Sequence, residues 1–143
     1  MITVKQLTEA DEQAVSEINT LLRQLRGDGS SMGTLEELKS ITSAEHVAMV
    51  VAEEEGKIVG VGSLYALQKM GKRSGIVEDV VVDESQRGKG IGEKIMRMII
   101  DIAREQQLST VSLTSRPSRA AAHHLYQKLG FEKRDTTPFR LRL

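Results

Sequence analysis

The chain contains no cysteine and no tryptophan, and only 3% of its 143 residues are aromatic. The absence of cysteine excludes a disulfide scaffold, a thiolate metal site and a cysteine nucleophile. Because aromatic side chains are so few, a hydrophobic core has to be built from Val, Ile, Leu, Ala and Met. Apolar residues make up 39% of the chain, which is enough for such a core and argues against wholesale disorder.

Neither sign of charge is in excess, because 20 Lys and Arg residues balance 20 Asp and Glu residues. A broad nucleic-acid surface needs a basic excess, so we expect no nucleic-acid partner. No apolar run approaches the ~18 residues of a membrane-spanning helix, and the first residues lack the apolar core of a secretory signal. The three histidines show no ligand spacing, so no metal is expected. We therefore expect one domain, residues 1–143, in the cytoplasm and without a membrane partner.

A glycine-rich run from Gln86 to Gly92 is the most informative segment. It follows the apolar run Ile76–Val82 and precedes an amphipathic stretch from Glu93 to Gln106. A strand, a tight glycine loop and a helix start together form an anion cradle, because the first helical amides are unpaired and the helix dipole adds positive charge there. Phosphate or pyrophosphate is the expected ligand.

The glycine spacing excludes the two commonest phosphate loops. A dinucleotide-binding loop needs G-x-G-x-x-G, but Glu93 stands where the third glycine belongs. No Gly-Lys pair of the chain is followed by the Ser or Thr of a P-loop. The remaining pattern, Arg87-x-x-Gly90-x-Gly92 after an apolar strand, resembles the acyl-coenzyme A loop of the GNAT N-acetyltransferase superfamily. From the residues alone, a glycine turn that caps a helix and binds nothing is the alternative.

A second motif spans Leu125 to Phe131. Apolar side chains recur at helical spacing up to Leu129, and Gly130 follows as a C-terminal cap. The motif is similar to the Tyr-x-x-x-Gly-Phe ending of a GNAT helix, in which the tyrosine hydroxyl often lies beside the coenzyme A sulfur. The alternative is that Tyr126 only packs on the core face of its helix.

The coarse element order is βααβββαβαββ, an α/β chain with a mixed sheet flanked by helices. This order matches the GNAT acyl-coenzyme A N-acyltransferase fold. The expected strands cover residues 2–7, 46–52, 58–67, 75–83, 109–115, 131–133 and 139–141, and the expected helices cover residues 14–25, 34–41, 90–106 and 118–129.

The resemblance implies a binding site for acetyl-coenzyme A, the cosubstrate. The fourth strand would pair with the pantetheine arm, and the glycine run would hold the pyrophosphate. Many relatives carry an Asn about seven residues before the tyrosine, where this chain has an arginine next to a serine that is also a plausible helix cap. The implied contacts come from Val80, Val81, Val82, Arg87, Gly88, Lys89, Gly90, Ile91, Gly92, Glu93, Ser118 and Arg119.

The resemblance also implies catalytic roles. Tyr126 would protonate the leaving thiolate, Glu78 would accept the amine proton, and the Val80 amide would stabilise the oxyanion. Asp79 is the rival base, since neighbouring strand residues face opposite sides unless the strand bulges. Either acid can instead be structural, pairing with an arginine or capping a helix.

The implied function is transfer of an acetyl group to a primary amine of a small polar molecule, a peptide or a protein. The Glu78-Asp79 pair resembles the glucosamine-6-phosphate N-acetyltransferases, whereas Thr114–Arg119 does not. The family places the acceptor near residues 23–33 and 136–139, and its members often form homodimers. A non-catalytic acyl-coenzyme A sensor and a nucleotide-phosphate binder are the alternatives.

Overall fold

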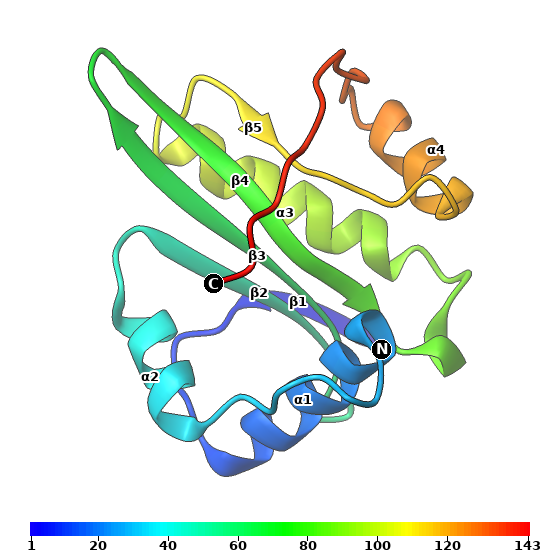
Figure 1. Cartoon of the computed structure of the whole chain (residues 1–143). Helices are drawn as coiled ribbons and strands as arrows, with labels where there is room; N and C mark the ends of the chain where they lie inside the picture. Colours follow the sequence, from blue (N-terminus) through cyan, green and yellow to red (C-terminus); the bar gives the residue numbers. More distant parts are fainter.

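A five-stranded mixed sheet forms the centre of the protein in a computed structural model that describes all 143 residues (Figure 1). The strands lie in the order in which they occur along the chain. The first four strands pair antiparallel, and the last is parallel to its neighbour. The strands are β1 (Ile2–Gln6), β2 (Val47–Glu54), β3 (Lys57–Lys69), β4 (Lys72–Val82) and β5 (Val111–Ser112).

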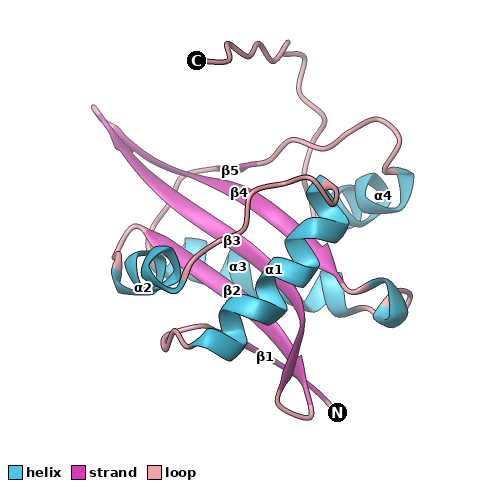
Figure 2. Ribbon diagram, turned by 60° about the horizontal axis from the view of Figure 1, so that its bottom comes forward, coloured by secondary structure: helices cyan, strands magenta, loops and turns pink.

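Helices cover both faces of the sheet (Figures 1 and 2). The helices are α1 (Glu12–Arg26), α2 (Leu35–Ser43), α3 (Ile91–Glu105) and α4 (Ala120–Lys128), with a 3-10 turn at Glu84–Gln86. Two of them, α1 and α2, lie on one face, while α3 lies on the opposite face with α4 beside it. The predicted α/β architecture is therefore confirmed.

Successive side chains of β2 point to opposite faces of the sheet and so belong to two separate hydrophobic cores. Val50 points to the α3 face and Val51 to the α1 face, and neither side chain is exposed at all. This is the period of two expected for a central strand covered on both sides. Tyr126 is the only aromatic side chain among the buried apolar residues, so aliphatic packing fills both cores, as the composition predicts.

The helix α2 begins at a capping box. The Thr34 hydroxyl accepts a hydrogen bond from the Glu37 amide at 3.1 Å, and the Glu37 carboxylate accepts one from the Thr34 amide at 2.9 Å. Two amides that a helix start leaves unpaired are thereby satisfied. This box fixes the end of the α1–α2 connection, which lies over the site described below.

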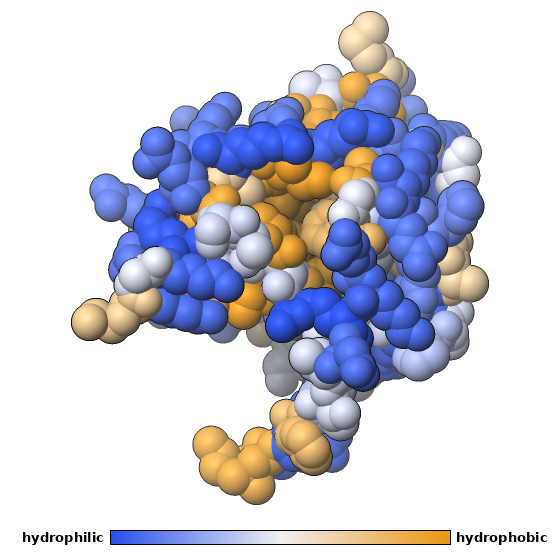
Figure 3. Space-filling view, turned by 90° about the horizontal axis from the view of Figure 1, so that it is seen from above, coloured by the Kyte–Doolittle hydropathy of each residue, from blue (hydrophilic) through white to orange (hydrophobic).

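The two last predicted strands, 131–133 and 139–141, do not form. Residues 132–143 are exposed and extend away from the sheet, and the exposed fraction of Phe139 reaches 94% (Figures 2 and 3). The neighbouring edge offers only the two residues of β5 as a template, and Pro138 lacks the amide that a ladder needs. The alternating pattern of the tail therefore has no partner strand within this chain.

Candidate active site

A bulge in β4 shapes the centre of the candidate site. Val81 pairs with Val61 and Glu78 pairs with Ser63, so one residue of β3 faces two residues of β4. The extra residue is accommodated at Asp79, which adopts a left-handed backbone with φ of 55°. Bulges of this kind redirect side chains and commonly lie next to active sites.

The bulge brings both acids to one region. Tyr65 on β3 has a pKa raised above its ordinary value, first by burial and then by the negative charges of Asp79 and Glu78. Both carboxylates therefore act on the same phenol, and the strict alternation that would separate them does not apply. Asp79 also binds Arg26 of α1, with Nη2 and Oδ2 2.6 Å apart. Glu78 is exposed and takes part in none of the ion pairs of the protein.

The β4 strand has a free edge beyond the bulge. Its pairing with β5 is limited to Gly75 with Val111 and Ile76 with Ser112. From Val77 to Val82 only β3 pairs with it. The side chains of Val80 and Val82 pack against the α3 core while Val81 packs against the α1 core. The outer edge of this segment pairs with no strand, and of its carbonyls that of Val82 accepts a hydrogen bond from Arg87 Nε.

The glycine run forms an open helix start. Gly88 and Gly90 have φ values of 81° and 76°, in the left-handed region that glycine adopts without strain. The helix α3 then begins at Ile91, and no side chain caps it. Its first amides point outward at the positive end of the helix dipole, which is the arrangement that binds phosphate. This geometry fits the pyrophosphate of coenzyme A.

The side chains around the cradle leave it positive. Glu93 lies in the first turn of α3, but its carboxylate contacts Lys128 at 2.7 Å and Arg97 at 2.9 Å. Hydrogen bonds from these two cations lower the pKa of Glu93, so it stays ionised and neutralised. Lys89 donates to Gln86 at 2.9 Å, and the Arg87 Nε donates to the Val82 carbonyl at 3.2 Å.

Tyr126 lies in the last turn of α4 with 8% of its surface exposed. The helix ends in a Schellman motif: Gly130 donates to the Gln127 carbonyl at 3.1 Å, and Phe131 donates to the Tyr126 carbonyl at 3.0 Å. Burial raises the pKa of Tyr126, and the charge of Arg119 opposes this in part. The phenol therefore stays protonated at neutral pH.

The three parts of the site meet at Gly92. A Cβ placed there would lie 3.7 Å from Leu125 Cδ2 and 3.8 Å from Val82 Cγ2. The start of α3, the end of β4 and the helix of Tyr126 are thus in contact. Ser118 is exposed and does not cap α4, whose N-cap is Arg119. The prediction of a Ser118 cap was wrong by one residue.

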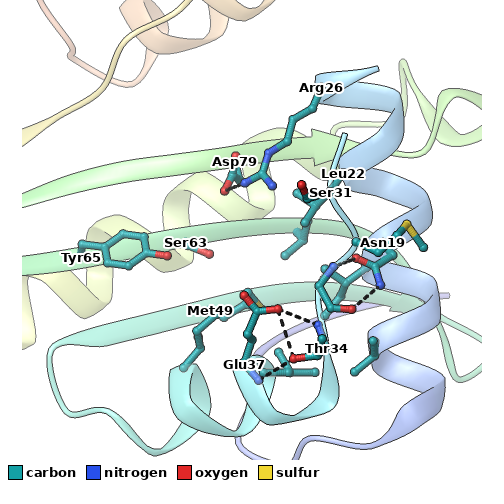
Figure 4. A pocket seen from close by; sticks show the side chains of 17 residues that line it. Asn19, Leu22, Arg26, Ser31, Thr34, Glu37, Met49, Ser63, Tyr65 and Asp79 are labelled. Carbon is teal, nitrogen blue, oxygen red and sulfur yellow. Dashed lines mark hydrogen bonds and ion pairs between the residues drawn. The ribbon is translucent and has the colours of Figure 1, made fainter. Parts of the chain in front are cut away.

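A pocket of about 250 Å³ opens on the α1 face of the sheet, beside the bulge (Figure 4). Its walls come from α1, the α1–α2 connection, α2 and the middle of β3. Asn19 fixes the connection over the pocket, because its amide donates to the Gly33 carbonyl at 2.9 Å and accepts from the Gly33 amide at 2.8 Å. The polar lining residues include Arg26, Ser63, Tyr65 and Asp79.

Comparison with known proteins decides the family. The model of the Acetyltransferase (GNAT) family matches residues 15–131. The chain belongs to the GNAT acetyltransferase family. Glucosamine 6-phosphate N-acetyltransferase 1 of Oryza sativa subsp. japonica is 31% identical over 104 residues, which are 70% of this chain and 61% of the rice protein.

Solved GNAT structures share the fold over the whole chain. Glucosamine-6-phosphate N-acetyltransferase of Arabidopsis thaliana superposes with a TM-score of 0.82 and 28% identity, covering 99% of this chain and 98% of that one. An acetyltransferase of Trypanosoma brucei gives a TM-score of 0.82 and 28% identity, with 100% of both chains covered. The chain spans less than two thirds of the length of the curated relatives it matches first.

In this GNAT chain, the residues that line the pocket differ in part from those that the sequence predicted for the acceptor site. Arg26 was expected in the acceptor region and lines the pocket, whereas Arg23, Asp28 and residues 136–139 do not. Ser63 and Tyr65 were missed, because they lie in a strand whose pattern indicates only burial. None of the helices combines the length and apolar character needed to cross a membrane.

Proposed function

We propose that residues 1–143 form one N-acetyltransferase domain, which transfers the acetyl group of acetyl-coenzyme A to a primary amine by direct attack in a ternary complex. One observation carries the proposal. The free edge of β4 lies between the uncapped start of α3 at one end and, across the bulge at Asp79, a pocket lined by Arg26 and Asp79 on the α1 face. Family membership supports the same chemistry.

The cosubstrate supplies an acetyl group activated as a thioester, and this chain supplies the binding groups. The backbone of Val80 to Val82 would pair with the pantetheine arm. The pyrophosphate would be held by the amides of Arg87, Gly88, Lys89, Gly90, Ile91, Gly92 and Glu93. We also propose that Arg119 and Ser118 contact the cosubstrate near α4, where the charge of Arg119 already acts on Tyr126.

Glu78 is the proposed acceptor of the amine proton. An amine attacks only when neutral, so a base has to remove its proton. Asp79 is bound to the Arg26 guanidinium at 2.6 Å, so its carboxylate already has a partner in the fold. Glu78 has no such partner and acts on the same phenol, Tyr65. These two facts favour Glu78 over Asp79.

Tyr126 is the proposed acid for the leaving thiolate. Its raised pKa keeps the phenol protonated at neutral pH, which is the form that can donate. The amide of Val80, next to the bulge, is the proposed donor to the oxygen on which negative charge develops. The relatives named as glucosamine 6-phosphate N-acetyltransferases make an amino-sugar phosphate one candidate acceptor.

The test is release of free thiol from acetyl-coenzyme A with a panel of amines. The chain has no cysteine, so it gives no background signal. We expect amine-dependent release that falls in Tyr126→Phe while calorimetry shows unchanged coenzyme A binding. Binding without release by any amine or protein lysine would favour a non-catalytic acyl-coenzyme A sensor instead.

A further inference from the structure

We infer that the acceptor is a zwitterionic α-amino acid with an apolar side chain, bound in the pocket between α1 and the β4 bulge. The inference rests on the proposed function and names its substrate class. It is drawn from three properties of the pocket: one cation, one neighbouring acid, and otherwise largely apolar walls.

The charged groups of the pocket form a single pair. Arg26 is the only basic side chain in the lining. Of the two acids, Glu37 is committed to the capping box of α2, which leaves Asp79. Figure 4 shows Arg26 and Asp79 directed toward one another at one end of the pocket.

Arg26 keeps capacity for a second anion. Its contact with Asp79 uses Nη2, and 45% of its side chain is exposed. A guanidinium carries five N–H donors in a planar fork, so it can bind a second carboxylate beside the first. A substrate carboxylate is therefore the natural partner for the exposed part of Arg26.

The acid side of the pair suits an ammonium group. The negative charges of Asp79 and Glu78 both act on the Tyr65 hydroxyl, so a cation placed beside that hydroxyl is attracted by both. Tyr65 and Ser63 lie two residues apart on β3, and both line the pocket (Figure 4). Glu78, the proposed base, does not line the pocket, but it is the cross-strand partner of Ser63.

The two charges of an α-amino acid are separated by a single carbon. Arg26 and Asp79 are in direct contact, so their charges are also close together. A zwitterion laid antiparallel to this pair places its carboxylate on Arg26 and its ammonium on Asp79. A simple amine has no carboxylate to bind the Arg26 guanidinium. A phosphate dianion would have only Arg26 to neutralise its two charges, and Arg26 is already paired with Asp79.

The remaining walls select the side chain. Six aliphatic residues and two methionines contribute to the lining, including Val15, Ile18, Leu22, Leu38 and Met49. A branched or thioether side chain packs against walls of this kind, whereas sugar hydroxyls would be left without hydrogen bonds there.

The reaction would balance as follows. The bound ammonium loses one proton to Glu78, its nitrogen forms a bond to the acetyl carbon, and the carbon–sulfur bond breaks. The nitrogen loses its second proton to solvent, and the thiolate takes one from Tyr126. Tyr126 then regains a proton from solvent, and Glu78 releases the one it accepted. The products are the N-acetylamino acid, the free thiol of coenzyme A and one released proton.

The experiment compares matched acceptors by kcat/KM in the thiol-release assay. L-leucine and L-methionine are measured beside isopentylamine, which is leucine without its carboxylate, and beside glucosamine 6-phosphate. We expect leucine or methionine to exceed isopentylamine by about tenfold or more, which is the effect of about 1.4 kcal/mol. Arg26→Gln should bring this ratio close to one, and Arg26→Lys should restore part of it.

A control and two contrary outcomes separate the inference from the proposed function. Arg104→Gln changes an exposed arginine at the far end of α3 and should keep the wild-type ratio. Faster turnover of isopentylamine or glucosamine 6-phosphate than of either amino acid would overturn the inference and leave the N-acetyltransferase proposal intact. Coenzyme A binding without turnover of any amine would overturn both.

Discussion

The rings of Tyr126 and Phe131 lie with centroids 5.9 Å apart and planes inclined by 59°. The Schellman motif at the end of α4 produces this contact, because its hydrogen bond from Phe131 to Tyr126 brings the two residues together. Gly130 makes the motif possible with φ of 99°. The sequence pattern Tyr-x-x-x-Gly-Phe thus describes a device that orients the proposed acid.

Gly130→Ala should lower the free energy of unfolding by about 1–2 kcal/mol, since a side chain is strained in the left-handed region. The matched control is Gly29→Ala, at an exposed loop glycine with open space and no positive φ. Urea unfolding of both variants checks the difference. Equal stabilities would mean that the motif does not hold the helix end.

Tyr126→Phe should lower kcat by about 10²–10⁴, the usual contribution of a positioned acid or base. The binding constant for coenzyme A, measured by calorimetry, should stay within a factor of two or so, because the ring and its packing on Phe131 are kept. Equal turnover in wild type and variant would remove Tyr126 from the mechanism.

Alkaline pH should destabilise the wild type more than Tyr126→Phe. Tyr126 ionises near pH 10 in the unfolded chain, but burial raises its pKa in the fold. As pH rises from about 10 to the folded pKa, only the unfolded chain has lost the proton, so the free energy of unfolding falls. Urea midpoints at pH 8 and pH 11 measure the effect. Tyr65 contributes equally to the pH dependence of both proteins, so its effect cancels in the comparison. If both proteins lost the same free energy of unfolding between pH 8 and pH 11, the phenol of Tyr126 would not be buried.

The pH–rate profiles of Glu78→Gln and Asp79→Asn should differ. Loss of the proposed base removes the acidic limb of the kcat/KM profile in Glu78→Gln. Asp79→Asn should keep that limb and mainly raise KM for the amine, since it leaves Arg26 without its partner. The opposite result would assign the proton transfer to Asp79.

Gly90→Ala should raise KM for acetyl-coenzyme A by about tenfold, because a strained helix start displaces the first amides of α3. Gly71→Ala is the control. The two glycines have φ values of 76° and 72° and open surroundings, but Gly71 lies in the β3–β4 turn. Both variants should lose a similar amount of stability, but only Gly90→Ala should lose affinity for acetyl-coenzyme A. A shared rise in KM would point to general destabilisation.

Local patterns explain why so much of the fold could be predicted. The helix starting at Ile91, the capping box of Thr34 and Glu37, and the glycine cap at Gly130 each depend on residues close in sequence. Their hydrogen bonds follow from side-chain type and spacing, without knowledge of the rest of the chain. The cradle could therefore be located before the fold was known.

The parts that could not be predicted depend on distant partners. Asp79 is on the same face as Glu78 only because β3 fixes the register on either side of the bulge. The pocket needs Arg26, Tyr65 and Asp79 from three different elements. The prediction of strands at residues 131–133 and 139–141 was wrong for the same reason. An alternating pattern forms a strand only when the edge of a partner strand is available.

The bulge also sets the tolerance of β4 to changes in length. Val77 and Val80 both pack against the α3 core although they are three residues apart, because the extra residue at the bulge keeps the strand in phase with the two cores. Deleting Asp79 would restore simple alternation and leave Val80, Val81 and Val82 on their present faces. Deletion of a regularly paired residue of the strand would instead turn the side chains beyond it to the opposite face. The packing of the two cores should therefore tolerate the loss of one residue at the bulge better than at the paired positions of this strand.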